Sequence, residues 1–529
     1  LRWQLHRHYW FIPLAKCYYT TGDAKYIDAW MDQYTDWVKK NPLDGVERLK
    51  AAGASAAEIA AEKENIRFAW RPMEAGRRLQ DLLTEFALTI HSPRFTPRFL
   101  NLFLRTYRQH ADHILHNYSK QGNHLLFEAQ RMLFAGIYFP EFREAQEWRR
   151  SGIEILNREI GVQVYPDGMQ FELDFGYHIA AIDIFLKALG MARANGYEGE
   201  FPASYIETVG KMTAVTWNLL FPDWSNPMFG DTKSHDKSSL QRQFRSWSKV
   251  FPGDKQLQWF ATEGRKGALP DYTSQQFPES GFYVLRTGWD KNATVTVVKA
   301  GPPAFWHNQP DNGTFELWHR GRNFFPDSGC YVYAGDKEVT DQRNWFRQTQ
   351  VHNTLTLDGR NLEHTDSKCL RWETDDATHI VTVGNPSYEG LTHRRTVWFV
   401  DRQFFVIADE ASGTAEGEVG LHYNLVECDP AEDFAACSAA TRFSDGNNLL
   451  LKVFGAERME RRKGWVSRTY RQRTERPAYA FTVRKRAGKP VRLVTVLLPA
   501  EDAAAQRVEA VWRGNRLQVK INGTKYNLK

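Results

Sequence analysis

The spacing of apolar residues along the chain changes near residue 280. Before that point apolar side chains recur every three or four residues over long stretches, as in residues 78–90 and 179–190, which is the period of an amphipathic α-helix. About ten such segments follow one another, separated by Gly, Pro or Asn. One of them, residues 51–64, is rich in Ala, Glu and Lys with a thin apolar stripe, and predicts a helix on the surface.

After residue 280 the apolar period becomes two. Runs such as residues 282–286 and 293–298 alternate in the manner of β-strands, and turn signals such as Asp358-Gly359 separate further runs. Many short strands without helices between them favour an antiparallel sandwich. We therefore predict a helical domain over residues 1–280 and an antiparallel β-sandwich domain over residues 281–529.

The length and the aromatic content add to this division. A chain of 529 residues is too long for one hydrophobic core, so two or more domains are expected. The sequence has 18 Trp, 21 Tyr and 33 Phe, which suits either grooves that hold sugar rings or large aromatic cores. No apolar run reaches the roughly 20 residues that span a bilayer, so we expect no membrane insertion.

Positive charge is concentrated in one short stretch. The chain has 69 basic and 63 acidic residues, a net charge of +6, which is compatible with an anionic ligand. The basic stretch has a strand-like pattern, so it forms either a solvated hairpin face or a docking surface for polyanions. No nucleic-acid-binding module is recognised, and we expect no nucleic acid partner. The basic residues are Arg458, Arg461, Arg462, Lys463, Arg468, Arg471, Arg473 and Arg476.

The cysteines do not predict a disulfide framework. They are five in number and widely spread, so they make neither a set of disulfides nor a CxxC metal site. No signal peptide is visible and the chain begins at Leu1, so we expect a mature or trimmed product. The cysteines are Cys17, Cys330, Cys369, Cys428 and Cys437.

Three short motifs contain the candidate chemistry. His307 lies at the start of a turn rich in Pro, Asn and Gly that precedes an alternating strand, where a loop meets a sheet edge. Asn123 precedes a helix that we expect to begin near residue 125, and Tyr177 lies where a loop enters the helix of residues 179–190. Each has an ordinary explanation as well: a satisfied surface histidine, a helix cap and a tyrosine bonded to backbone.

Taken together, the three side chains supply the parts of one reaction, the β-elimination of a uronic acid. The proton on carbon 5 becomes acidic only when the neighbouring carboxylate is neutralised, which an amide or a protonated imidazole does. A base must then take the proton, and an acid must protonate the departing glycosidic oxygen. A phenol has an ordinary pKa of about 10, so a tyrosine base needs a lowered pKa.

These motifs and their order resemble the heparinase II/III group of polysaccharide lyases, and within it the heparinase III type of polysaccharide lyase family 12. The similarity runs from Arg2 to the C-terminal strands and is colinear. The segments that carry it are residues 121–135 (QGNHLLFEAQRMLFA), 168–186 (GMQFELDFGYHIAAIDIFL), 226–231 (NPMFGD), 307–317 (HNQPDNGTFEL) and 343–358 (RNWFRQTQVHNTLTLD).

The resemblance implies a multidomain fold, α then β: an N-terminal incomplete (α/α) toroid, a C-terminal antiparallel β-sandwich, and a substrate cleft between them. The family's chains begin with a further helical region, which we expect to be absent from the domain of residues 1–280. The implied activity is endo-acting β-elimination of heparan sulfate at glucosamine–uronate linkages, which leaves 4,5-unsaturated uronate ends.

The resemblance also assigns roles by motif. Asn123 would neutralise the uronate carboxylate, Tyr177 would be the general acid and His307 the base. Whether Tyr177 is also the base stays open, because in a glucuronate the proton and the leaving group lie on the same face. Further substrate contacts are expected from His124, His178, Asn226, Arg131 and Arg347, although an arginine would equally brace an acidic side chain.

A structural metal is a further implication. In the related heparinase II type a metal lies in the sandwich at positions that correspond by motif to Gln309, Asp327 and His352. The glutamine replaces an expected histidine, and the set, richer in oxygen, suits zinc less well. Ordinary hydrogen bonding and a structural calcium or zinc both stay open, and no cofactor is expected to be required for catalysis.

Other functions stay open beside this one. A lyase for another uronate polymer, such as alginate or chondroitin, would keep the same three catalytic roles. A glycoside hydrolase needs two opposed carboxylates, and a glycan-binding protein needs no poised acid and base. From the resemblance we expect heparan sulfate as the partner, a monomer, and the periplasm as the location. The carboxylate candidates for hydrolysis are Glu172, Asp174, Asp311 and Glu316.

Overall fold

The structure is a computed structural model that describes residues 2–304, 306–363, 366–375 and 377–529. Two compact units make up the chain: unit 1 comprises residues 1–163 and 181–207, and unit 2 comprises residues 164–180 and 208–529. Helices precede strands along the chain, as predicted, since α13 (Lys255–Thr262) ends before β1 (Gln275–Phe277) begins. The predicted domain boundary at residue 280 stays a prediction.

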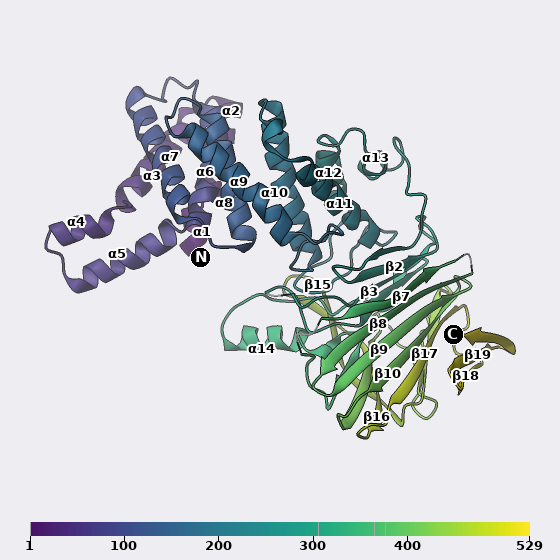
Figure 1. Cartoon of the computed structure of the whole chain (residues 1–529). Helices are drawn as coiled ribbons and strands as arrows, with labels where there is room; N and C mark the ends of the chain where they lie inside the picture. The colour runs from purple at the N-terminus through teal and green to yellow at the C-terminus, as the bar shows by residue number, and fades with distance from the viewer. Residues whose placement is uncertain (1, 305, 364–365, 376) are drawn as a thin grey trace. The chain divides into compact units, whose positions relative to one another are not determined.

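Unit 1 is α-helical throughout its described residues (Figure 1). Two helices, α10 (Phe175–Ala194) and α11 (Ala203–Leu219), run from one unit into the other. The remaining helices of unit 1 are α1 (Arg2–His6), η1 (Tyr9–Phe11), α2 (Ile12–Thr21), α3 (Ala24–Lys40), α4 (Gly45–Ala51), α5 (Ala56–Ala69), α6 (Pro72–Thr89), α7 (Pro97–Asn117), α8 (Gly122–Tyr138), α9 (Ala145–Gln163) and η2 (Glu198–Glu200).

The helix predicted over residues 51–64 is displaced along the chain. Ser55 caps α5 by accepting a hydrogen bond from the backbone N–H of Glu58, while the Glu58 side chain accepts from the Ser55 N–H. This capping box fixes the start of α5 at Ala56, and α4 ends at Ala51. The composition thus predicted helical structure correctly and its boundary wrongly.

Aromatic side chains form much of the core of unit 1. Trp30, Tyr34 and Phe103 are fully buried within one apolar cluster. Helices α8 and α9 approach each other closely at two glycines: a Cβ on Gly136 would lie 2.2 Å from the Ala145 carbonyl oxygen, and one on Gly152 would lie 2.4 Å from that of Ala129. A larger residue at either glycine would therefore push the two helices apart.

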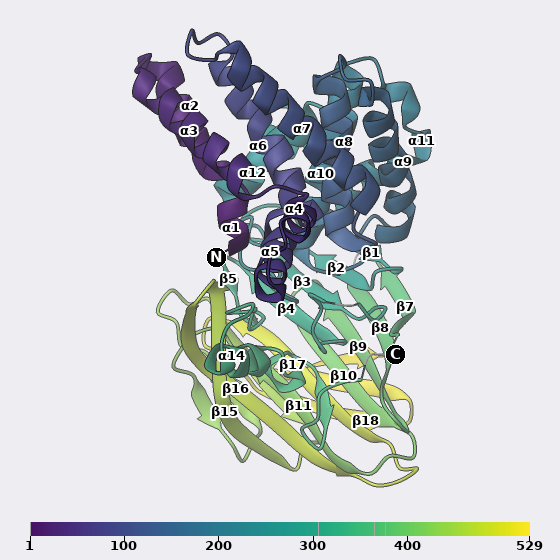
Figure 2. The same cartoon turned by 90° about the vertical axis from the view of Figure 1, so that its left-hand side faces the viewer.

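The described residues of unit 2 form four antiparallel sheets, several strands of which are labelled in Figure 2. In order across each sheet, the first has β1, β2 (Phe282–Arg286), β3 (Thr294–Lys299), β4 (Thr314–His319) and β5 (Arg322–Asn323). The second has β12 (Ala431–Asp433), β13 (Ser438–Ala440), β14 (Asn448–Phe454), β17 (Val491–Ala500), β10 (Phe404–Ser412), β9 (Leu391–Val400), β8 (Thr378–Tyr388) and β7 (Lys368–Thr374). The third has β15 (Arg458–Thr469), β16 (Gln472–Lys485), β11 (Gly417–Asn424) and β6 (Leu355–Leu357), and the fourth has β18 (Val508–Arg513), β19 (Arg516–Ile521) and β20 (Thr524–Leu528).

The eight-stranded sheet lies between two apolar cores because its strands are hydrophobic on both faces. On β9, Val397 and Phe399 belong to the core shared with the four- and five-stranded sheets. Trp398 and Val400, on the opposite face, belong to the core shared with the three-stranded sheet. The helices of unit 2 outside these layers are α12 (Lys237–Ser248), α13, α14 (Lys337–Phe346) and η3 (Thr349–Val351).

Helix α10 is long and apolar enough to cross a membrane by length and composition, and the expected lack of membrane insertion stays a prediction. In the apolar part of this helix, 56% is buried inside the protein, as in the core helix of a globular domain.

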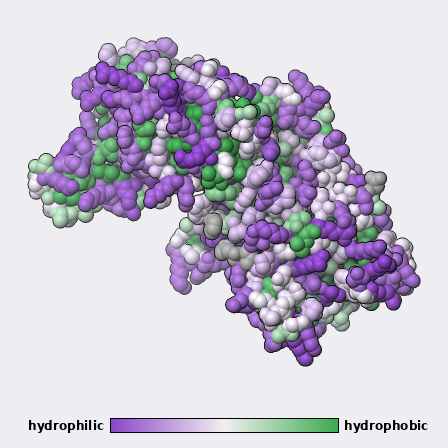
Figure 3. Space-filling view, in the orientation of Figure 1, coloured by the Kyte–Doolittle hydropathy of each residue, from purple (hydrophilic) through white to green (hydrophobic). Residues whose placement is uncertain are grey.

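The face of the molecule drawn in Figure 3 is mostly hydrophilic, with hydrophobic residues in separate groups.

Candidate active site

The first turn of α10 positions Tyr177. Oδ1 of Asp174 accepts a hydrogen bond from the backbone N–H of Tyr177 at 3.0 Å, which is an N-cap contact. Oγ1 of Thr232 accepts from the N–H of Gly176 at 3.2 Å. Two of the free N–H groups of the helix start are therefore occupied, and the phenol projects from a fixed turn.

His307 packs against this phenol. The rings of Tyr177 and His307 are stacked with their centroids 3.8 Å apart and an angle of 15° between their planes. The Nδ1 atom of His307 lies 3.0 Å from Oδ2 of Asp231, and the Nε2 atom lies 3.6 Å from Oε2 of Glu172. The second distance exceeds that of a hydrogen bond, so the geometry assigns the ring proton to Nδ1 and the lone pair to Nε2.

The loop before Asp231 approaches His307 closely. The backbone N–H of Asp231 donates to the carbonyl oxygen of His307 at 2.9 Å. Gly230 has a φ of +83°, and a Cβ there would lie 2.8 Å from the same carbonyl oxygen. A glycine is therefore required at this position, because any side chain would be both strained and in contact with His307.

The carboxylates around His307 differ in charge state. Burial raises the pKa of Asp231, but hydrogen bonds from His307 and Arg343 outweigh it and the pKa falls below the usual value. The Arg343 contact is 2.5 Å long, from Nη2 to Oδ2. Burial raises the pKa of Glu172, and it raises that of Asp174 to about 7. Of these three carboxylates, Asp231 is thus the one whose pKa shift favours the ionised form.

Tyr177 is protonated at neutral pH. Burial raises its pKa to about 12, and a hydrogen bond with Tyr333 offsets this only in part. The hydroxyl of Tyr333 donates to the backbone oxygen of Asp231 at 2.9 Å. A phenol in this state can donate a proton but is a poor base at neutral pH.

A pocket opens beside the phenol, within unit 2. Its wall combines the start of α10 with the segment that follows Gly230, the loop before α14 and the end of β15. The lining therefore combines polar and charged side chains with tyrosine rings. The lining residues are Asp174, Gly176, Tyr177, Ala180, Asp231, Thr232, Lys233, His235, Cys330, Tyr331, Tyr333, Ser467, Thr469 and Tyr470.

Asn123 and His124 lie in unit 1, in the first turn of α8. The N-cap residue of α8 is Gln121, with no side-chain cap bond, so the helix-cap explanation for Asn123 is wrong. Nδ1 of His124 lies 3.2 Å from a guanidinium nitrogen of Arg71. Burial and this cation lower the pKa of His124, which favours the neutral ring.

The remaining predicted contact residues have partners inside the protein. His178 is fully buried; its Nε2 donates to the Met212 carbonyl and its Nδ1 accepts from the Gln170 N–H. Burial lowers the pKa of His178 to about 4, so the ring is neutral. This placement makes His178 structural, against our expectation of substrate contact.

Asn226 and the two arginines are also held internally. Oδ1 of Asn226 accepts from the N–H of His235, and its amide donates to the Pro227 carbonyl. Arg131 is buried and contacts Gln80 and Gln130 through its guanidinium. Arg347 donates to the carbonyl oxygen of Asn308 at 3.2 Å and is partly exposed. Substrate contact by these three residues stays a prediction.

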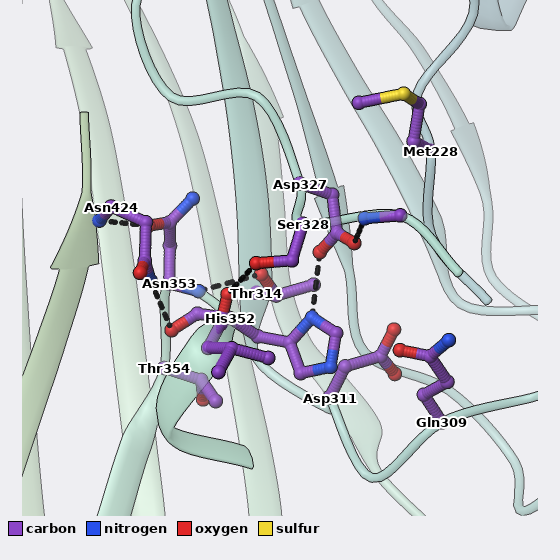
Figure 4. A network of polar contacts seen from close by, with 12 residues as sticks. Met228, Gln309, Asp311, Thr314, Asp327, Ser328, His352, Asn353, Thr354 and Asn424 are labelled. Atoms are coloured by element: carbon purple, nitrogen blue, oxygen red, sulfur yellow. Dashed lines mark hydrogen bonds and ion pairs between the residues drawn. The ribbon is translucent and has the colours of Figure 1, made fainter. Parts of the chain in front are cut away.

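The predicted metal position is a buried polar cluster (Figure 4). Nδ1 of His352 lies 2.6 Å from Oδ2 of Asp327, and the other ring nitrogen is directed toward Asp311 and Gln309. That nitrogen and Oε1 of Gln309 are buried and have no hydrogen-bond partner among the described residues. Those residues contain no group of three or more His, Cys, Asp or Glu that could hold a metal ion.

Asp231 is a partner of His307 that was not predicted from the sequence. Asp231 ends the quoted segment 226–231, so the motif contained the residue but gave it no role. The guanidinium of Arg343 contacts the same carboxylate. An acidic residue directly after an aromatic residue and a glycine was the sequence signal that could have pointed to Asp231.

A protonated phenol stacked on a histidine–carboxylate pair at a pocket defines an acid–base enzyme. The models of the Heparinase II/III N-terminus and the Heparinase II/III-like C-terminal domain match residues 1–259 and 270–505. The chain belongs to the heparinase II/III family.

Two curated relatives are named heparin-sulfate lyase. The one from Bacteroides stercoris is 49% identical over 100% of this chain and 81% of its own length. The one from Pedobacter heparinus is 45% identical over 96% of this chain and 75% of its own length. Each aligns across both parts of the chain, so the similarity is not confined to one domain.

Solved structures give the same result for the fold. A heparinase III gene product superposes with a TM-score of 0.90 at 50% identity, covering 99% of this chain and 83% of that one. A heparan sulfate lyase from Pedobacter heparinus superposes with a TM-score of 0.83 at 43% identity, covering 99% of this chain and 82% of that one. The predicted family and fold, a helical toroid followed by an antiparallel β-sandwich, are confirmed.

Proposed function

We propose that this protein is a heparin-sulfate lyase that cleaves heparan sulfate by β-elimination. The observation that carries the proposal is the stack of Tyr177 on His307, with Asp231 on the far nitrogen of the imidazole. The names of the two curated relatives support the substrate class. The acid and the base of an elimination are thus adjacent, and the tautomer of the base is set.

The proposed reaction transfers one proton from the substrate to the enzyme and one proton from the enzyme to the substrate. Nε2 of His307 takes the proton on carbon 5 of the uronate, while the amide of Asn123 neutralises the carboxylate and stabilises the enolate-like charge. The electron pair then forms the double bond between carbons 4 and 5, and the glycosidic oxygen leaves carbon 4. Tyr177 gives its phenolic proton to that oxygen.

Separate groups for base and acid suit the ionisation of the site. With a pKa of about 12, Tyr177 begins the cycle as a phenol. Because a phenolate at neutral pH would be rare, we assign the base to His307 and only the acid to Tyr177. The three side chains supply every role in these steps, and none is assigned to a metal or an organic cofactor.

Glycoside hydrolysis fits the structure less well. Of the candidate carboxylates, Asp311 is buried against Lys299, whose ammonium lies 2.8 Å from both of its oxygens. Glu316 is fully buried and accepts from the Met228 N–H at 2.6 Å. Neither faces a ligand, so the opposed pair that hydrolysis requires would have to come from Glu172 and Asp174 alone.

A structural cation is a separate proposal. The unpartnered Nε2 of His352 and Oε1 of Gln309, with Asp327 beside them, fit an ion with nitrogen and oxygen ligands. Burial lowers the pKa of His352, but the adjacent Asp327 outweighs burial and raises the pKa above the usual value. This ion would stabilise the sandwich, and we assign it no step of the reaction.

Two expectations rest on the resemblance alone. We propose a periplasmic location and a monomeric state, which cell fractionation and light scattering of the purified protein would test. A cytoplasmic pool or a stable dimer would overturn them without affecting the proposed chemistry.

The deciding experiment follows ultraviolet absorbance during digestion of heparan sulfate, with heparin, chondroitin sulfate and alginate in parallel. We expect the absorbance of unsaturated uronate to rise fastest on heparan sulfate. A faster rise on chondroitin sulfate or alginate would assign another uronate polymer. Depolymerisation without absorbance would mean hydrolysis and overturn the proposal.

A further inference from the structure

The hairpin of residues 458–476, here called the basic hairpin, holds the positive charge of the chain. It runs from the start of β15 into β16 and contains eight basic and two acidic residues, a net charge of +6 that equals that of all 529 residues. The reaction proposed above uses none of these side chains. A surface that concentrates one sign of charge is expected to attract a polyanion.

Some of these charges are already neutralised within the protein. Arg458, Arg461 and Arg468 form ion pairs with glutamates, and the guanidinium of Arg476 is buried against the carbonyl oxygen of Pro326. The other four basic side chains are exposed and form no ion pair with the described residues. These four are Arg462, Lys463, Arg471 and Arg473.

Two of the unpaired cations flank an aromatic ring in a groove. The Lys463 ammonium lies 5.3 Å and the Arg473 guanidinium 4.5 Å from the centroid of Trp465. Helix α14 forms the opposite wall and contributes Trp345. Sugar rings pack on indole faces, and sulfates and carboxylates bind beside them to guanidinium and ammonium groups. Lys337, Glu338, Asp341 and Gln342 complete the lining.

The groove lies near the pocket beside Tyr177. Arg473 also lies 5.0 Å from the ring centroid of Tyr331, and Tyr331 lines that pocket. The turn after β15 contributes Tyr470 to the same pocket. The basic hairpin therefore borders both the pocket and the groove, and all of these residues lie in unit 2.

We propose that α14 and the basic hairpin form a second binding site, which holds a distal segment of the same sulfated uronate polysaccharide that is cleaved at Tyr177. The proposal rests on the proposed function for its choice of polyanion. Occupancy of the groove raises the effective concentration of the next linkage at the pocket. The site therefore favours long chains and leaves the chemistry of each cleavage unchanged.

The test compares two double variants that remove the same charge. In Lys463→Gln/Arg473→Gln the lost cations are unpaired, and in the control Arg458→Gln/Arg461→Gln they are ion-paired. For the first we expect KM on long heparan sulfate to rise about tenfold, with kcat, and turnover of a tetrasaccharide, unchanged. The control is expected to change KM less than twofold. Equal KM values for the two variants, or an equal loss on the tetrasaccharide, would overturn the proposal.

Binding provides a readout that does not depend on turnover. The Lys463→Gln/Arg473→Gln variant should elute from immobilised heparan sulfate at lower salt than the control, and Trp465→Ala should also elute earlier although its charge is unchanged. If the native protein forms no unsaturated uronate, the proposed function fails. The elution order still tests whether the groove binds heparan sulfate. Tighter binding to single-stranded DNA than to heparan sulfate would overturn the ligand class.

Discussion

Replacing Asp231 with asparagine removes the negative charge beside Nδ1 of His307 and keeps the size of the side chain. Oδ2 of Asp231 accepts from both His307 and Arg343, at 3.0 and 2.5 Å. An amide oxygen can occupy the same position and accept from the same donors. The orientation of the ring is therefore kept, and the variant isolates the contribution of charge.

The expected loss follows from the strength of this contact. The Asp231 side chain is fully buried and that of His307 is 21% exposed. A hydrogen bond to a charged group contributes roughly 1.5–3 kcal/mol, and about 1.4 kcal/mol corresponds to tenfold in rate. The predicted fall in kcat is therefore about 10- to 150-fold, with KM changed little because Asp231 acts through His307.

The assay is the initial rate of unsaturated uronate formation over a range of heparan sulfate concentrations, which separates kcat from KM. The loss in Asp231→Asn should lie in kcat. Arg343→Gln is the matched control, because it removes the other partner of the same oxygen and leaves the charge beside His307. Its fall in kcat should be smaller than that of Asp231→Asn.

A double-mutant cycle can refute the reasoning. If Asp231 acts through His307, Asp231→Asn should add little to the loss already caused by His307→Ala. A multiplicative loss in the double variant, or a single variant within twofold of native activity, would show that Asp231 does not position the base.

Three further predictions follow from the site. Tyr177→Phe should lower kcat about 10²- to 10⁴-fold at unchanged melting temperature, and a near-normal rate would remove the acid role. Burial raises the pKa of Asp174 to about 7, and a raised carboxyl pKa destabilises the folded state as pH rises through it, so the native protein should lose roughly 3–4 kcal/mol of folding stability between pH 4 and 7. Asp174→Asn, which keeps the helix cap, should lack this loss when melting temperatures are measured across that pH range. Parallel curves of melting temperature against pH for the two proteins would contradict the prediction. Gln309→Ala should reduce the metal content of purified protein and its melting temperature, with kcat of the folded fraction unchanged; no bound metal in the native protein would end that proposal.

Periodicity predicted the fold because each half has a consistent pattern. The strand expected over residues 282–286 is β2, Phe282–Arg286, and the antiparallel arrangement follows from short strands joined by turns. The order across the sheets was not predictable, since β17 lies between β14 and β10, which are far from it in sequence. That order depends on which apolar faces are shared between layers, and a single strand does not specify this.

The motifs indicated Tyr177 and His307 because phenol and imidazole have few roles at the edge of a turn, and the structure stacks the two rings. Their catalytic roles stay predictions. Their contact joins segments that no local pattern links, and Asp231 is 76 residues from His307 in sequence. His178 shows the opposite error, since its place beside Tyr177 in the motif suggested a ligand contact, whereas the helix turns its ring into the core.

The three carboxylates around His307 carry less charge than their number suggests. Like charges in a buried site cannot all ionise, and the pKa falls only for Asp231, which contacts both His307 and Arg343, while it rises for Glu172 and Asp174. The negative charge therefore lies on the Nδ1 side of the imidazole, where it supports the positive charge of a ring that has taken a proton. The Nε2 side faces Glu172, whose raised pKa favours the neutral acid. A uronate that binds here as proposed therefore meets less negative charge on the Nε2 side of the imidazole than on the Nδ1 side.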